Sequence, residues 1–269
     1  MTRWRWECNI MGSFVTNLHV RDADRDAVME ALRSLDLVPA YVRGSPETPW
    51  TSIFPEAGYQ DDAALPEMAR ALSKALKRPV IAFIVHDSDI FLYWLCDDGK
   101  ELDRYNSAPD YFAGQMTPPE GGNPDMLKVY CQPGTTTDHL LRLLHPERNA
   151  PQPPAERKID RDAIKEAVRK KLRQSYPTLA AKMPNPPSLE EFLAAAERRL
   201  AERPSPDESA SSAAQEFLFA EDRLVELAKI LDIPSGPAID SYRYLADGEG
   251  SPGLLTLVQA EGETSIHLK

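Results

Sequence analysis

Cysteine is scarce in this sequence, which has only Cys8, Cys96 and Cys131 among its 269 residues. An odd number without CxxC spacing argues against a disulfide framework and against a structural zinc site. No apolar run approaches the ~18 residues that a transmembrane helix needs. The N-terminus, MTRWRWECNI, lacks the apolar stretch of a secretory signal peptide. We therefore expect a cytoplasmic protein that does not enter a membrane.

Positive charge is also in short supply, because 31 Lys and Arg face 42 Asp and Glu, for a formal net charge of −11. Nucleic-acid binding requires a basic surface, so the composition disfavours a nucleic-acid binder. An acidic surface suits a basic protein partner, although surplus acid also keeps proteins soluble. Basic residues concentrate in a predicted helix at Ile159–Gln174. We expect this helix to contact the protein's own acidic half or to be solvated, and not to dock an outside partner.

Glycine is sparse beside proline, with 13 glycines against 24 prolines that crowd together after Pro109. The stretch TPPEGGNPD indicates a long ordered loop, and Asn149–Glu156 has the composition of a linker. The first ten residues read as a loosely attached tail, with Met11 as an alternative start. The predicted parts are this tail (1–10), an α+β domain (11–113), a Pro/Gly-rich connection with a short helix (114–158) and a mainly helical C-terminal region (159–269).

Strand and helix patterns alternate in the N-terminal half, and their order is β-α-β-β-α-β. This order is typical of a ferredoxin-like α+β sandwich, in which both helices cross one face of an antiparallel sheet. A mainly helical C-terminal half with a short terminal β element should follow. The predicted elements are strands at Ser13–Val20, Pro39–Val42, Trp50–Phe54 and Val80–Val85, helices at Asp24–Leu35 and Asp61–Leu76, and an added hairpin of Ile90–Cys96 and Glu101–Tyr105.

Two of these strands, VIAFIVH and IFLYWLC, are apolar on both faces. A sheet that is half exposed to water alternates apolar with polar residues, so both faces here should be covered. The two predicted helices cover only one face. We expect the C-terminal half or a second copy to cover the other, with the basic helix Ile159–Gln174 as the first candidate. The C-terminal half is predicted to contain helices at Leu189–Glu202 and Ala213–Leu231 and strands at Ala238–Leu245 and Gly253–Gln259.

His86, Asp87 and Asp89 lie together between these two apolar strands. Asp87-Ser88 has the length of a tight hairpin turn, and aspartate tolerates the positive φ that such turns need. Catalysis by His86 would need a nucleophile and an oxyanion donor, and a metal would need further ligands; the sequence supplies neither set. We therefore expect a hairpin tip at which His86 and Asp89 face each other as a surface ion pair.

A glycine and three threonines, Gly134, Thr135, Thr136 and Thr137, precede a short predicted helix. Backbone N–H groups at such a helix start can hold a phosphate. The segment has neither the spacing nor the lysine of a P-loop. We therefore interpret it as a capping segment with Thr137 or Asp138 as the N-cap, and we expect no cofactor.

The leading hypothesis is a non-enzymatic interaction protein that binds another protein, such as an inhibitor, an immunity-like factor or an assembly adaptor. It rests on the acidic charge and on the lack of a catalytic constellation. The alternatives are a hydrolase that uses His86 with Asp87 or Asp89, a metal enzyme built around Asp97, Asp98 and Asp103, and a small-ligand sensor. A deep pocket with converging polar groups would favour the alternatives.

Overall fold

The computed structural model describes residues 12–44, 46–114, 117–146, 188–191, 193–194 and 219–268. The chain divides into two compact units, one formed by residues 11–149 and 213–269 and the other by residues 1–10 and 150–212. The predicted basic helix at Ile159–Gln174, the N-terminal tail and the linker Asn149–Glu156 lie outside the described residues. None of the helices in the described ranges is long and apolar enough to cross a bilayer.

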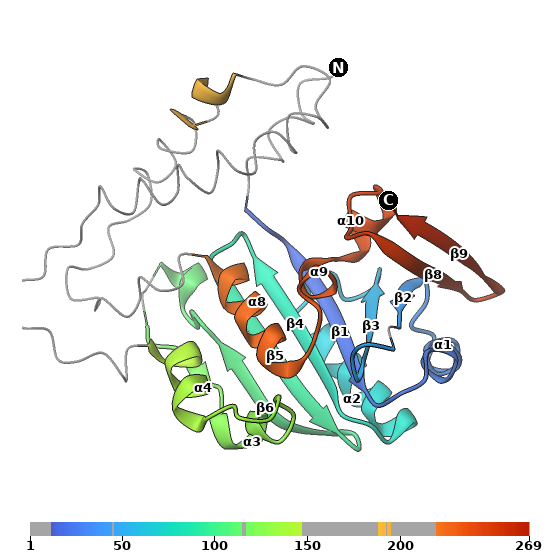
Figure 1. The fold of residues 1–269 in the computed structure, drawn as a ribbon, viewed down its shortest axis with the longest axis horizontal. Coiled ribbons are helices and arrows are strands. Elements are labelled where there is room, and N and C mark those ends of the chain that lie inside the picture. The colour runs from blue at the N-terminus through green and yellow to red at the C-terminus, as the bar shows by residue number, and fades with distance from the viewer. Residues whose placement is uncertain are drawn as a thin grey trace, which may run out of the picture. The chain divides into compact units, whose positions relative to one another are not determined.

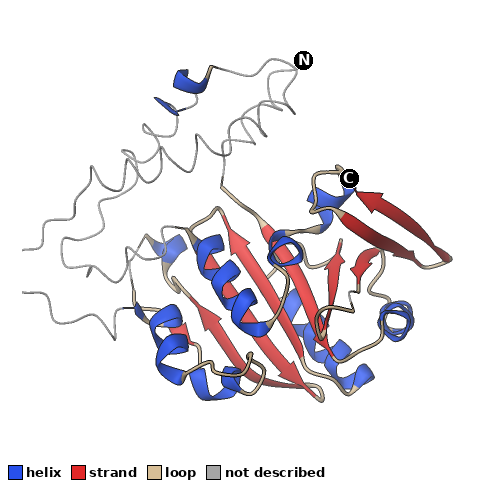
Figure 2. Cartoon of the chain, in the orientation of Figure 1, coloured by secondary structure: helices blue, strands red, loops and turns tan. Residues whose placement is uncertain are grey.

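The first unit is mixed α and β (Figure 2). Its strands form one large antiparallel sheet in the order β7-β6-β5-β4-β1-β3-β2-β8-β9. Its strands are β1 (Val15–Arg21), β2 (Ala40–Arg43), β3 (Trp50–Pro55), β4 (Val80–His86), β5 (Ile90–Asp97), β6 (Lys100–Asn106), β7 (Glu120–Gly121), β8 (Gly253–Gln259) and β9 (Gly262–Leu268). Its helices are α1 (Arg25–Ser34), α2 (Ala64–Leu76), η1 (Tyr111–Ala113), α3 (Pro124–Lys128), α4 (Thr137–Leu144), α8 (Ala220–Leu231), α9 (Ser235–Ile239) and α10 (Tyr242–Ala246).

Helices α1 and α2 pack on one face of the sheet and begin where the sequence provides acidic caps. Asp24 accepts a hydrogen bond from the Asp26 amide at 3.3 Å, and α1 follows directly. The Asp61 carboxylate accepts from the amides of Ala63 and Ala64 at 3.0 and 2.9 Å. The apolar stripes of both helices are buried against the sheet, as their periodicity predicts. This core includes Val28, Leu32, Leu65, Ala69 and Leu72 from the helices and Leu18, Val20, Ile53, Val80 and Ala82 from the strands.

Helix α8 lies across the opposite face of the sheet, over β4 and β5, and α3 and α4 lie beside it (Figure 1). Leu224 and Leu227 of α8 are fully buried there, and each buried leucine is worth roughly 1.5–3 kcal/mol. Trp50 of β3 donates from its indole Nε1 to the Leu231 carbonyl at 2.6 Å and so caps the end of α8. The prediction that the C-terminal half covers the second face is confirmed, with α8 as a cover.

The C-terminal end of the described chain differs from the sequence prediction. The strand predicted at Ala238–Leu245 is wrong, because this segment forms α9 and α10. Helices of five residues are too short to display a 3.6-residue period, and the alternation in AIDSYRYL imitates a strand. The strand predicted at Gly253–Gln259 is β8, which pairs with β2. A turn connects β8 to β9, an antiparallel strand that the sequence analysis did not predict.

Candidate functional site

The turn between β4 and β5 has the predicted backbone, because Asp87 and Ser88 have φ values of 51° and 59°. The predicted ion pair between His86 and Asp89 is wrong. The strand register places His86 opposite Ile90. The carboxylate of Asp89 instead accepts a hydrogen bond from the Tyr111 hydroxyl at 2.7 Å.

The His86 ring is held by an amide and two aromatic rings. Its Nδ1 lies 3.0 Å from Gln60 Oε1. The ring also meets Phe14 and Phe112 edge-on, with centroids 5.1 and 5.4 Å away. Gln60 in turn donates from Nε2 to the Val85 carbonyl at 3.0 Å. The amide of Gln60 is neither a nucleophile nor a charge partner, so this arrangement orients the ring without giving His86 a reaction to catalyse.

The surface beside this turn presents an exposed aromatic side chain. Phe112 lies in η1 and is 79% exposed, although its ring contacts Tyr111 with centroids 5.3 Å apart. Asp110 lies two residues before it in the sequence, and the β4–β5 turn carries Asp87 and Asp89. We call the group formed by His86, Asp87, Asp89, Asp110, Tyr111 and Phe112 the tip surface.

Helix α8 is hydrogen-bonded to the turn that carries part of the tip surface. The Ala220 amide at the start of α8 donates to the Ser88 carbonyl at 2.9 Å. The Ser88 hydroxyl donates to Glu221 Oε1 at 3.2 Å. Because Ser88 is the second turn residue, these bonds join the hairpin tip to a buried helix. The β4–β5 turn of the tip surface is therefore held in place by α8.

A buried polar row crosses the face of the sheet beneath α9, and the sequence prediction assigned it no role. His19 Nδ1 lies 2.9 Å from Ser52 Oγ, and His19 Nε2 lies 3.0 Å from Asn17 Oδ1. Burial lowers the pKa of His19 from 6.5 to about 3, so the ring is neutral. Although the residue types match a Ser-His-Asn triad, Asn17 and His19 have no exposed surface and Ser52 is 2% exposed. A substrate cannot reach this serine, so the row is structural.

Asn17 connects this row to the C-terminal segment. Its Nδ2 donates to the backbone carbonyls of Ala238 and Asp240 at 2.9 and 3.0 Å. Buried carbonyls at the end of α9 are thereby satisfied by a side chain from β1. The polar residues of β1 thus anchor a segment that lies some 220 positions later in the chain.

A buried ion pair lies next to this anchor. Arg43 Nη1 of β2 is 3.5 Å from Asp240 Oδ2, and the two side chains are only 10% and 6% exposed. Arg43 also donates to the hydroxyl and the carbonyl of Ser251 at 2.6 and 2.7 Å. Burial lowers the pKa of Arg43, and the charge of Asp240 acts against that shift. The pair joins β2 to the loops on both sides of α10.

The acidic residues proposed for a metal site do not converge. Asp98 occupies the β5–β6 turn with a φ of 45°. Asp103 points to other partners, accepting from the Tyr93 hydroxyl at 2.6 Å and the Asn123 amide at 2.8 Å. Burial raises the pKa of Asp103. Within the described ranges, no group of three or more His, Cys, Asp or Glu residues is arranged to hold a metal ion.

The threonine segment before α4 forms a helix cap. Thr136, and not the predicted Thr137 or Asp138, is the N-cap, and its hydroxyl accepts from the His139 amide at 3.1 Å. Thr135 donates its hydroxyl hydrogen to the Gln132 carbonyl at 2.9 Å. These two hydroxyls serve the loop itself, and the segment keeps its interpretation as a cap.

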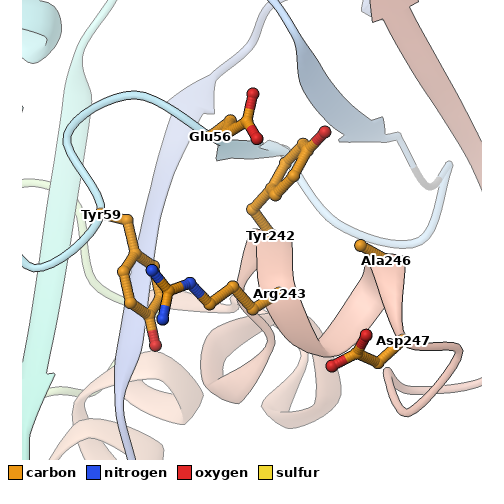
Figure 3. A pocket seen from close by; sticks show the side chains of 6 residues that line it. All are labelled: Glu56, Tyr59, Tyr242, Arg243, Ala246 and Asp247. Atoms are coloured by element: carbon orange, nitrogen blue, oxygen red, sulfur yellow. The ribbon is translucent and has the colours of Figure 1, made fainter.

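A small pocket of about 270 Å³ lies between the β3–α2 loop and α10 (Figure 3). The guanidinium of Arg243 lies over the ring of Tyr59, 4.3 Å from its centroid. Glu56 lies beside Tyr242, and Asp247 stands apart at the end of α10. One cation and two carboxylates line the pocket, without a group positioned as a nucleophile beside a base.

The described cysteines are poor nucleophiles. Cys96 is fully buried in β5, and burial raises its pKa to about 12. Cys131 is partly buried, with a pKa raised to about 11 by burial. Thiols with such values carry little thiolate at neutral pH, and thiolate is the reactive form. Neither cysteine is placed for covalent catalysis.

No protein-family model matches the chain, and neither a curated protein nor a solved structure matches it.

Proposed function

We propose that the chain is a non-enzymatic cytoplasmic interaction protein that binds another protein through the tip surface. The observation that carries this proposal is the 79% exposure of Phe112. Aromatic side chains, phenylalanine among them, are enriched in protein–protein interfaces, where they can enter a pocket on the partner. Among the large apolar side chains that the structure describes, none is more exposed than Phe112.

The aromatic side chains of the tip surface are also held in place by contacts within the chain. Phe112 is held beside Tyr111 and His86 by ring contacts. Tyr111 is held by its hydrogen bond to Asp89. An aromatic group that is oriented before binding loses less conformational entropy on association than a mobile one.

Charge indicates the class of partner. Asp87, Asp89 and Asp110 give the tip surface three carboxylates, in a chain whose formal net charge is −11. Two of them also accept hydrogen bonds within the chain, Asp87 from the Gly12 amide and Asp89 from the Tyr111 hydroxyl. Complementary charge steers association and selects partners. We therefore propose a partner that presents an apolar recess surrounded by lysine or arginine residues.

The geometry gives less support to the alternatives. The Ser52-His19-Asn17 row is out of reach of solvent, and His86 contacts an amide. The pocket of about 270 Å³ is slightly smaller than the ~300 Å³ at which small-molecule sites usually begin. A hydrolase and a small-ligand sensor therefore each lack a site of the expected form in the described residues.

The ferredoxin-like architecture belongs to the same proposal. We infer that β1 to β4 with α1 and α2 form this unit. The order β4-β1-β3-β2 with antiparallel neighbours supports the inference, as do the two helices that share one face. The hairpin of β5 and β6 then extends the unit at the β4 edge, and the tip surface lies at its first turn.

Affinity capture from native cell extract tests the proposed function. We expect Phe112→Ser to reduce the retained partner at least about tenfold, because truncating an aromatic hot spot commonly costs 2 kcal/mol or more. The matched control is Val129→Ser, which removes an apolar side chain that is 74% exposed outside the tip surface. It should retain the partner as the wild type does.

Equal retention by Phe112→Ser and Val129→Ser would remove the tip surface from the proposal. Thermal unfolding of both variants should match the wild type to within a few degrees, because exposed substitutions change stability little. This measurement separates a lost contact from a lost fold.

A further inference from the structure

The two edges of the sheet differ in how they end. At one edge lies β7, a strand of two residues. At the other edge lies β9, a strand of seven residues at Gly262–Leu268. An edge strand presents unpaired backbone N–H and C=O groups, and proteins usually blunt such edges by making them short, bulged or proline-containing. The β7 edge is short, but the β9 edge is long.

Strand β9 has few of the other protective features, and Glu263 is its one residue of the Asp, Glu, Lys and Arg types. Its sequence, GETSIHL, contains neither proline nor lysine. Its register with β8 runs without a bulge from Gly262 opposite Gln259 to Leu268 opposite Gly253. The side chains of Glu263, Thr264, Ser265 and His267 are exposed. A regular strand of this length can accept one further antiparallel strand.

We propose that the occupant of this edge is β9 of a second copy of the chain, paired antiparallel about a two-fold axis at Ser265. In that register Glu263 lies opposite His267 of the second copy, and the same pair recurs on the other side of the axis. Thr264 lies opposite Ile266, which pairs two β-branched side chains. An imidazole N–H can donate a hydrogen bond to the Glu263 carboxylate, and opposed β-branched residues favour cross-strand pairing. The strand is thus complementary to itself.

The surroundings of the edge are compatible with this pairing. Arg33 of α1 contacts Glu263 at 2.9 Å and orients its carboxylate. On the opposite face, Ile266 and Leu268 pack with the cluster around Leu255 and Leu245. Strand β9 is therefore packed on one face of the sheet, while its outward N–H and C=O groups lie along the sheet edge. Joining the two copies would produce one continuous antiparallel sheet.

The first test is the mass of the full-length chain in solution, measured by sedimentation from a few µM to on the order of 100 µM, the range in which weak complexes form. We expect a concentration-dependent dimer. Ser265→Lys places two ammonium groups opposite each other and should raise the dimer dissociation constant roughly fivefold or more. Gln259→Lys adds the same charge to β8, away from the paired strand, and should leave it unchanged.

The second test locates the two-fold axis. Directly opposed residues in antiparallel strands have Cα atoms ~4.5–5.5 Å apart, which lies within the range of a disulfide. Ser265→Cys should therefore form a covalent dimer under mild oxidation, whereas Gln259→Cys and the wild type should not. A monomer at every concentration would overturn the proposal. A dimer that Ser265→Lys and Gln259→Lys weaken equally, or that Ser265→Cys fails to link, would also overturn it.

Discussion

Replacing Asp240 with alanine is expected to lower the free energy of unfolding by about 3–5 kcal/mol. Asp240 is the counter-charge of Arg43, and both side chains are almost fully buried. Removing the carboxylate leaves a buried guanidinium without an opposite charge, which costs more than the pair itself contributes. The Ser251 amide, which donates to Asp240 Oδ1 at 2.9 Å, loses its acceptor as well.

Urea unfolding of the full-length chain measures this effect. Asp247→Ala is the matched control, because Asp247 is an exposed aspartate a few residues away. It should change the free energy by no more than ~0.5 kcal/mol. Asp240→Asn keeps the shape but removes the charge, so its loss should lie between those of the two alanine variants. A loss for Asp240→Ala of no more than about 1 kcal/mol, the size of an ordinary substitution, would show that the pair is solvated.

Acid should destabilise the protein through His19. Its pKa falls from 6.5 in the unfolded chain to about 3 in the folded protein. The unfolded state therefore binds a proton first as the pH drops, so this contribution to stability is complete above pH 6.5 and is lost progressively toward pH 3. Between pH 7 and pH 5 the expected loss is about 2 kcal/mol, because each pKa unit corresponds to 1.36 kcal/mol.

The variant His19→Gln separates this effect from other titrations. It removes the ionisable group, so the difference in unfolding free energy between wild type and variant should fall by about 2 kcal/mol from pH 7 to pH 5. The NMR signals of the His19 ring should meanwhile keep their neutral positions down to pH 5 in the folded protein. A constant difference between the two proteins over this range would contradict the buried neutral histidine.

Periodicity predicted the N-terminal elements well because each is long enough to display it. The helix predicted at Asp61–Leu76 and α2 end at the same residue. Its six apolar positions repeat along one face, and Asp61 supplies the cap. The same reasoning failed at Ala238–Leu245, where each helix has five residues. It also missed β9, because an exposed edge strand has few apolar residues to mark it.

The buried polar groups could not have been assigned from the sequence, although their spacing was visible. Asn17 and His19 alternate with Leu18 and Val20 along β1, a pattern typical of a strand with one face in water. In the fold that face is covered by the segment around Ala238, which accepts hydrogen bonds from Asn17. Nothing in local sequence links positions so far apart. The alternation therefore indicated a strand correctly, but it suggested a solvent-exposed face that is in fact buried.

The cluster at His86 shows the opposite case. The turn geometry at Asp87 and Ser88 was predictable, because two residues between apolar runs favour a tight turn. The partner of His86 was not, since Gln60 comes from the loop before α2. The exposure of Phe112 was equally hidden, because an aromatic residue is most often buried. The tip surface forms only when two segments that are separate in the sequence, the β4–β5 turn and η1, meet.

Site-specific photocrosslinking tests the central claim, that the tip surface contacts a partner protein, most directly. The full-length chain would carry p-benzoylphenylalanine in place of Phe112, and a matched protein would carry it in place of Val129, which is similarly exposed. Irradiation in native extract should join a discrete partner to the chain from position 112 and not from position 129. Equal products from both positions, or a product from position 129 alone, would contradict the claim.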